Sequence, residues 1–266
     1  MTKRLLVSGT DDALHNQMAL LLFLAGCFKA SPCFFDKIII LTPVDCALHP
    51  VLLYYIASNK ISVRTLPPVP GTDRREDPYS VKLLLATLLK SVSQNIEEVL
   101  YLDPDHLVFS TPSFGVHSGN FYVSSEDYPL PLFDSKGLIV YNTSLMYASL
   151  TTWLSIADSW IANYLDLRST VGFRHREEVA FARSTRNSSC KVIPVSPIIQ
   201  GNFNRLSMDS HLFHYGGESQ GTYAVKNYLS QTIRDLHAEN LSRTINHALE
   251  RVKQIIDQYA IIVPVI

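Results

Sequence analysis

Short apolar runs alternate with helix-like segments through the first third of the chain. Continuous apolar runs bounded by turn-forming residues predict strands at residues 4–7, 37–41 and 61–66. Between them, residues 13–28 are apolar nearly all round and residues 51–58 keep a helical pattern, so both predict helices. Strand and helix alternating at this spacing imply right-handed βαβ units, and we expect an α/β fold with a half-sheet of the nucleotide-binding type.

The centre of the chain leads into a strand that ends abruptly. Residues 67–78 are rich in proline, glycine and charge and predict a surface loop. Residues 79–91 predict a helix with Lys82 in its first turn, close to the sheet. The apolar run at residues 99–102 then predicts a buried central strand, and a second apolar run follows at residues 107–109.

The second half of the chain mixes short strands with longer helices. Residues 111–134 are rich in aromatic residues and predict strands and turns, and residues 201–204 predict a loop. Further strands are predicted at residues 138–142 and 191–195, and further helices at residues 145–165 and 174–184. We expect Trp153 and Trp160 to lie in the core, because large aromatic side chains dominate core burial.

The C-terminal part of the chain is helical by pattern. Residues 223–259 keep apolar positions at helical spacing, with a break predicted at Asn240. We therefore expect a main domain at residues 1–222 and a helical segment at residues 223–266 that packs on this domain or on a partner, including a second copy in a homodimer. The apolar residues 261–266 fit either an edge strand or an interface.

Composition and charge exclude several classes of protein. The chain has 266 residues, of which 47% are hydrophobic and 18% charged, as in an ordinary globular protein with a sizeable core. Its formal net charge of −1 gives no basic field for nucleic acid. No stretch reaches the about 18–20 apolar residues of a membrane span. The four cysteines form no C-x-x-C pair, so we expect a reduced, cytoplasmic location. We also expect no secretion signal.

Two aspartates stand where the central strand ends. Asp103 and Asp105 flank Pro104, and two carboxylates at the carboxyl end of a strand can hold a hard cation, which in turn can hold phosphate oxygens. Asp-Pro-Asp is also turn chemistry, so the local sequence leaves a plain turn open. His214 follows an apolar pair and precedes Tyr215 and two glycines, which fits either a ligand near a close backbone approach or a satisfied histidine at a strand end.

The order of these motifs resembles that of the GT-A glycosyltransferases, in particular the type of glycogenin and of the bacterial lipooligosaccharide galactosyltransferases. The resemblance covers roughly residues 1–217. It rests on a turn after the first strand, a lysine before the central strand, a D-x-D motif, an Asn-containing strand, an acidic helix start and a late H-x-G motif. The matching residues are Ser8 to Asp11, Lys82, Tyr101 to Asp105, Tyr141 to Ser144, Glu177, Glu178 and His214 to Gly216.

The resemblance implies a role for each matching position. Asp103, Asp105 and His214 would bind Mn²⁺ (or Mg²⁺) together with the diphosphate of a nucleotide sugar. The residues that would surround the nucleotide sugar are Ser8, Gly9, Thr10, Asp11, Lys82, Gly216 and Gly217. Asn142 and one of Glu177 or Glu178 would face the sugar and the acceptor. The implied fold is a GT-A-like, Rossmann-type mixed sheet flanked by helices.

The implied reaction is hexose transfer from a nucleoside diphosphate sugar, by analogy a UDP-sugar, to a glycan or glycolipid acceptor, with retention favoured. Two other readings stay open. A non-catalytic nucleotide-sugar-binding or scaffold protein of the same fold would explain the weakened asparagine motif, in which Leu145 follows Ser144 in place of a glycine. A sugar-nucleotidyltransferase would want a glycine-rich phosphate loop after the first strand, where this chain supplies only Gly9.

Overall fold

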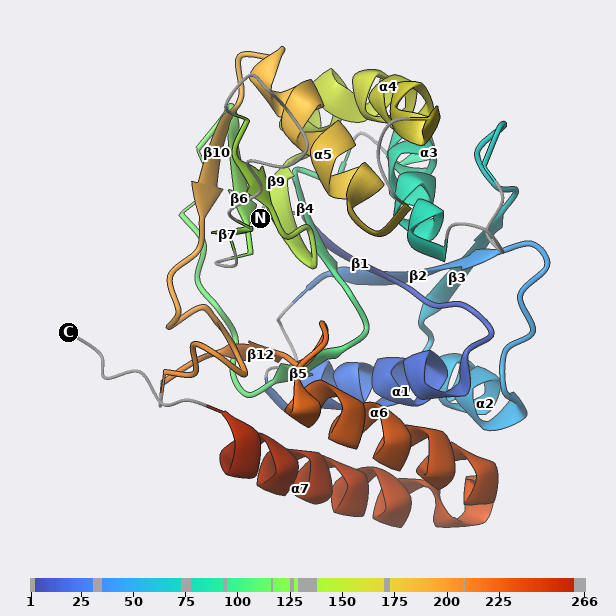
Figure 1. The fold of residues 1–266 in the computed structure, drawn as a ribbon. Helices are drawn as coiled ribbons and strands as arrows, with labels where there is room; N and C mark the ends of the chain where they lie inside the picture. Colours follow the sequence, from blue (N-terminus) through green and yellow to red (C-terminus); the bar gives the residue numbers. More distant parts are fainter. Residues whose placement is uncertain are drawn as a thin grey trace.

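The structure, a computed structural model, is built on one mixed sheet between two helical layers (Figure 1). It describes residues 3–30, 35–72, 78–92, 95–115, 117–124, 127–128, 138–169, 173–207 and 209–260. The sheet has seven strands in the order β10-β6-β9-β4-β1-β2-β3. Their bounds are Arg4–Gly9 (β1), Lys37–Pro43 (β2), Ser62–Leu66 (β3), Glu98–Leu102 (β4), Asn120–Val123 (β6), Leu145–Ser149 (β9) and Lys191–Pro194 (β10).

The first half of the sheet is parallel, as the sequence predicts. β1 pairs in parallel with β2 and with β4, and β2 pairs in parallel with β3. Side chains alternate between two cores: Leu6 and Leu100 contribute to one, and Leu5 and Val99 to the other. A strand buried on both faces needs apolar residues at every position, which explains its continuous apolar run.

The prediction of a helix over residues 145–165 is wrong at its start. Leu145–Ser149 forms β9, which lies antiparallel between β4 and β6. Helix α4, Leu150–Asp166, begins only after Ser149, whose side chain accepts a hydrogen bond from the Thr152 backbone N–H. A short apolar run reads the same in a doubly buried strand as in a buried helix, so periodicity alone does not separate the two.

A second, three-stranded sheet lies under the end of β4. Its order is β11 (Gln200–Asn202), β12 (Leu212–His214) and β5 (His106–Val108). β11 overlaps the loop predicted at residues 201–204, which is therefore wrong in its first two residues. An ideal Cβ at Gly201 would lie 2.9 Å from Ser210 Oγ, so the chain packs too closely there for most side chains.

A two-stranded ribbon pairs β7 (Asp127–Tyr128) with β8 (Val140–Tyr141). β8 is shorter than the strand predicted at residues 138–142. Residues 129–134 of the aromatic stretch lie outside the described residues, as do residues 261–266.

The helices form one layer on each face of the sheet (Figure 1). One layer holds α1 (Leu14–Ala30), α2 (Pro50–Ser58), α6 (Gln220–Thr232) and α7 (Leu241–Tyr259). The other holds α3 (Leu83–Ser91), α4 and α5 (Phe173–Arg186), together with the buried Trp153 and Trp160. The predicted break at Asn240 is confirmed, because short 3-10 turns separate α6 from α7. Among the described residues, no helix is long and apolar enough to cross a membrane.

Candidate metal and nucleotide site

The Asp103, Asp105 and His214 side chains converge beyond the carboxyl end of β4. Each offers one ligand atom, and the three ligand atoms lie within 4.8 Å of one another. His214 Nε2 is 3.4 Å from Asp105 Oδ1. We call these three residues the triad. The order of the motifs predicts this grouping, and the structure brings it together from two distant parts of the chain.

Local folding explains why these residues meet. Residues 104 and 105 form a turn, so the turn reading of Asp-Pro-Asp is correct, and this turn also directs both carboxylates to one place. The antiparallel register of β5 and β12 sets His214 opposite His106. The backbone N–H of Tyr215 donates to the carbonyl of Asp105 over 3.0 Å and ties the two segments together.

Lys82 lies between two carboxylates behind the triad. It ends the 3-10 turn Pro78–Lys82 that precedes α3, so it lies just outside the helix in which we expected it. Its Nζ is 2.8 Å from Asp103 Oδ2 and 3.0 Å from Glu177 Oε1. Burial acts to lower the pKa of Lys82, but these carboxylates outweigh burial and hold the pKa well above its usual value.

The two aspartates of the triad differ in their environments. Burial raises the pKa of Asp103, although Lys82 opposes this and the Tyr101 hydroxyl donates to Asp103 Oδ1 over 2.8 Å. Burial also acts to raise the pKa of Asp105, but His214, with smaller contributions from His106 and Lys226, holds it well below its usual range. Asp105 is therefore the more strongly ionised carboxylate of the pair.

The triad fits a divalent cation. Asp105 Oδ1 is buried and accepts no hydrogen bond from the described residues, so this oxygen has a lone pair available for a ligand. An ideal Cβ at Gly216 would clash with His214 Nε2 and lie 2.5 Å from Asp105 Oδ2, so only glycine lets the backbone pass over the triad. Two carboxylates and one imidazole are a donor set that suits Mn²⁺.

A cavity of about 470 Å³ opens in front of the triad. The predicted site residues that line it are Gly9, Thr10, Asp11, Lys82, Asp103, Asp105, Asn142, Glu177, Glu178, His214 and Gly217. Ser8 and Gly216 are not part of the lining. Ser8 is fully buried in the sheet and its hydroxyl donates to the Leu102 carbonyl over 2.7 Å.

The acidic start of α5 supplies two carboxylates in different settings. Glu177 Oε1 accepts a hydrogen bond from Thr143 Oγ1 as well as from Lys82, and Oε2 is buried with no hydrogen-bond partner among the described residues. Burial raises the pKa of Glu177 to about 7. Glu178 Oε2 accepts a hydrogen bond from His175 Nδ1 over 2.9 Å. Asn142 Oδ1 accepts from the Ser144 N–H over 2.7 Å and so stabilises its own turn.

Several cavity residues escape the sequence analysis. His15 and Asn16 come from the start of α1, and Tyr223 and Lys226 come from α6. Each lies in a segment whose apolar pattern defines only the buried face of a helix. A polar residue beside that face gives no signal until the helix is placed next to the triad.

The charge of the lining is strongly acidic. Among the described residues, six carboxylates line the cavity (Asp11, Asp103, Asp105, Glu177, Glu178 and Glu218), against two lysines. Lys82 is already held by two of these carboxylates. Lys226 makes no hydrogen bond or ion pair with the residues that the structure describes, and it lies close enough to Asp105 and His15 to influence the pKa of each. An anion entering this cavity therefore needs additional positive charge.

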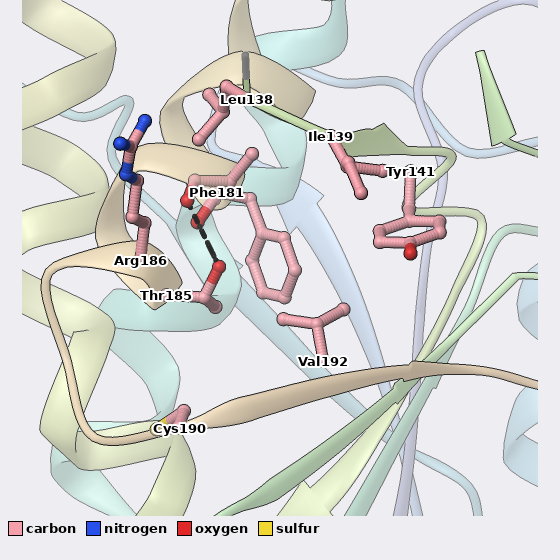
Figure 2. A pocket seen from close by; sticks show the side chains of 9 residues that line it. Leu138, Ile139, Tyr141, Phe181, Thr185, Arg186, Cys190 and Val192 are labelled. Atoms are coloured by element: carbon pink, nitrogen blue, oxygen red, sulfur yellow. Dashed lines mark hydrogen bonds between the residues drawn. The ribbon is translucent and has the colours of Figure 1, made fainter. Parts of the chain in front are cut away.

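A second cavity, of about 300 Å³, lies further along α5 (Figure 2). Its lining is mainly apolar and holds no carboxylate or histidine among the described residues. The ring of Phe181 extends from α5 toward Tyr141 and Val192, and Arg186 is the one charged lining residue in the described part of the chain. This lining shares no residue with the triad.

Comparisons with known proteins give the fold and leave the family open. No family model matches the chain, and no curated protein matches its sequence. The crystal structure of the galactosyltransferase LgtC in complex with donor and acceptor sugar analogues aligns over 89% of this chain and 98% of that one, with a TM-score of 0.61 and 13% identity. An active-site mutant of LgtC aligns over 91% and 99%, with a TM-score of 0.59 and 13% identity.

The chain therefore has the GT-A fold of these galactosyltransferases, and the fold expected from the resemblance is confirmed. At 13% identity, this likeness concerns the fold alone. The activity must be argued from the site.

Proposed function

We propose that the protein is a metal-dependent glycosyltransferase that moves a hexose from a nucleoside diphosphate sugar to a glycan or glycolipid acceptor. The observation that carries this proposal is the triad of Asp103, Asp105 and His214 at the end of β4, facing a cavity of about 470 Å³. A cavity of this volume is in the usual range for small-molecule sites. LgtC, which shares the fold, was crystallised with donor and acceptor sugar analogues, and this supports a sugar donor and acceptor here.

The triad would hold Mn²⁺ or Mg²⁺. When bound, the cation would act as a Lewis acid that stabilises the negative charge of a nucleoside diphosphate leaving group. An acidic lining would otherwise repel a diphosphate, so the charge of the cavity itself favours a metal-dependent site.

The chain's own residues would orient the donor. Lys226 has no ion-pair partner among the described residues and would bind the diphosphate directly. Lys82 instead bridges Asp103 and Glu177 and offsets the repulsion between the two carboxylates. Gly9, Thr10 and Asp11 lie at the carboxyl end of β1, where open α/β sheets bind nucleotides. UDP as the nucleotide and retention of configuration are part of the proposal by analogy.

Glu178 is the carboxylate best placed to meet a sugar hydroxyl. It lines the cavity, and His175 donates to one of its oxygens, which holds the carboxylate in place. Glu177 is more deeply enclosed, with a side chain that is 1% exposed. We therefore assign contact with the sugar or acceptor to Glu178. Glu177 instead keeps Lys82 and Thr143 in place.

The second candidate is a non-catalytic nucleotide-sugar-binding protein of the same fold. One observation favours it: Asn142 Oδ1 stabilises a local turn, although the resemblance would have this residue face the sugar. Such a protein would bind donor without transferring or hydrolysing it. A cytoplasmic location, a homodimer and a domain boundary at residue 222 stay predictions from the sequence.

The test is calorimetric titration with a panel of nucleotide sugars, each with Mn²⁺ and with a chelator. Metal-dependent binding of one donor, followed by slow donor hydrolysis, would support the transferase. Binding without hydrolysis or transfer across an acceptor panel would favour the second candidate. No binding to any donor in either condition would refute both.

A further inference from the structure

A buried histidine lies directly behind the triad. His106 follows Asp105, starts β5 and is 0% exposed. It does not line the cavity, so neither a nucleotide nor a sugar in the cavity would touch it. A buried imidazole at this place needs an explanation, because polar groups in a core cost free energy unless their hydrogen bonds are made.

The hydrogen bonds of His106 define the orientation of its ring. Nδ1 is 2.9 Å from the carbonyl oxygen of Asp103. A carbonyl can only accept, so Nδ1 carries the proton and donates. Nε2 is 2.8 Å from Gln200 Nε2, and in the neutral ring Nε2 accepts an amide N–H from Gln200. His106 is thereby held in one orientation, with a hydrogen-bond partner at each ring nitrogen.

The same ring stacks on a member of the triad. The His106 and His214 ring centroids are 4.8 Å apart and the ring planes differ by 20°. The two residues lie opposite each other in the antiparallel β5–β12 pair. Because His106 cannot rotate without losing its hydrogen bonds, its flat face restricts the rotation of His214 and keeps His214 Nε2 near Asp105.

A closed network links this histidine back to the turn that carries the aspartates. Gln200 Nε2 also donates to Ser144 Oγ over 3.2 Å. The carbonyl of Ser144 accepts the backbone N–H of Asp103 over 2.8 Å. Both backbone groups of Asp103 are therefore held, its N–H by Ser144 and its carbonyl by His106. One residue, His106, contacts both halves of the triad.

We propose that His106 is a positioning residue of the metal site, which raises the affinity for a divalent cation without touching it. This inference rests on the proposed metal-dependent function. A preorganised ligand set loses less conformational freedom when the cation binds. Residues that orient metal ligands typically change metal affinity by about 10–100-fold when they are replaced. A purely structural role would lower stability and leave metal affinity unchanged.

The experiment measures Mn²⁺ affinity by electron paramagnetic resonance in the presence of UDP, together with thermal stability in the absence of metal. His106→Phe keeps a flat ring and removes both hydrogen bonds, and His106→Gln keeps hydrogen bonding and removes the stack. The matched control is His211→Phe, because His211 lies just before β12, donates to or accepts from Ser110 Oγ over 2.6 Å, and makes no described contact with the triad.

We expect each His106 variant to weaken Mn²⁺ binding on the order of 10-fold and the His211 variant to leave it within about 2-fold. A folded His106→Phe protein with the Mn²⁺ affinity of His211→Phe would overturn the inference while leaving the proposed function intact. No Mn²⁺ binding by the wild-type protein would overturn both.

A measurement on the wild-type protein covers the case in which the variants fail to fold. Imidazole ¹⁵N spectra should show the His214 Nε2 resonance shifting on addition of Mg²⁺ and UDP while both His106 ring resonances stay unchanged. A His106 ring nitrogen that shifts together with His214 Nε2 would refute the inference, because His106 would then touch the cation itself.

Discussion

Helix α5 lines two cavities of opposite character. Its first turns supply His175, Glu177 and Glu178 to the acidic cavity that faces the triad. Its last turns supply Phe181, Ala182, Thr185 and Arg186 to the apolar cavity. The end of β8 divides in the same way, because Tyr141, its last residue, lines the apolar cavity and Asn142, which follows it, lines the acidic one.

The two cavities differ in the free-energy cost of their linings. An apolar cavity costs only lost packing contacts, so it arises wherever side chains fail to fill space. Burying Lys82, Asp103 and Glu177 together is expensive, and a chain keeps such a group against that cost where it has a use for the charge. The group of buried charged side chains therefore marks the acidic cavity as the candidate site more clearly than cavity volume does.

Asp105→Asn should cause the largest loss of ligand binding in the acidic cavity. It removes the most strongly ionised ligand of the triad, so Mn²⁺-dependent UDP binding should fall by about 100-fold or more, since even indirect partners of metal ligands cost about 10–100-fold. Calorimetry with and without chelator measures this. Asp257→Asn, an exposed change on α7, is the control. Equal UDP affinity in the two variants would show that the triad holds no metal.

Glu177→Gln should change how stability depends on pH. The folded-state pKa of about 7 is above the ordinary value of 4.5, so between these values the folded protein binds more protons than the unfolded chain. This contribution to stability is present below pH 4.5 and is lost as pH rises through about 7. Relative to the wild type, the variant should gain about 2–3 kcal/mol between pH 5 and pH 8, measured by urea unfolding.

That measurement has a clear contrary result. Parallel stability profiles for wild type and Glu177→Gln would mean that Lys82 keeps Glu177 ionised in the folded protein at every pH tested. Burying the charged groups of the acidic cavity would then cost less free energy than the extent of their burial implies.

Lys226→Gln should have a smaller effect confined to nucleotides with a diphosphate. Losing one charge-assisted contact should weaken UDP binding by about 10-fold and leave uridine binding unchanged. Lys191→Gln, at the exposed start of β10, removes the same charge outside the cavity and should have no effect. If both variants bind UDP equally well, the diphosphate does not lie against α6.

Phe181→Leu should have the smallest effect on binding, namely none. Phe181 packs edge-on against Phe121 and Trp160, so the variant should lose about 1–2 kcal/mol of unfolding free energy. UDP and Mn²⁺ affinities, measured by the same calorimetry, should equal those of the wild type. A selective loss of donor affinity would mean that the two cavities act as one site.

The sequence predicts the fold where pattern and topology agree. The parallel half-sheet, the two core tryptophans and the break at Asn240 are all read from local patterns. β9 is not, because Leu145 to Ser149 becomes a strand only through pairing with β4 and β6 on either side. β11 is not either, because its glycine and polar residues gain a strand conformation from β12.

The residues of the candidate site also differ in whether a local sequence pattern reveals them. Asp103 and Asp105 can be identified from the sequence, because two carboxylates interrupt an apolar strand. His214 is found through motif order, whereas its contact with His106 depends on the β5–β12 register, which no local pattern encodes. Lys226 and His15 reach the cavity only after α6 and α1 pack side by side in one core.

The pairing of β5 with β12 also sets when the triad can be completed during synthesis of the chain. Ribosomes add about 5–20 residues per second, and early segments begin to fold before later ones emerge. The two aspartates leave the ribosome long before His214, so a nascent chain holds only part of the triad. On the proposed function, an incomplete or truncated polypeptide would therefore bind a metal poorly.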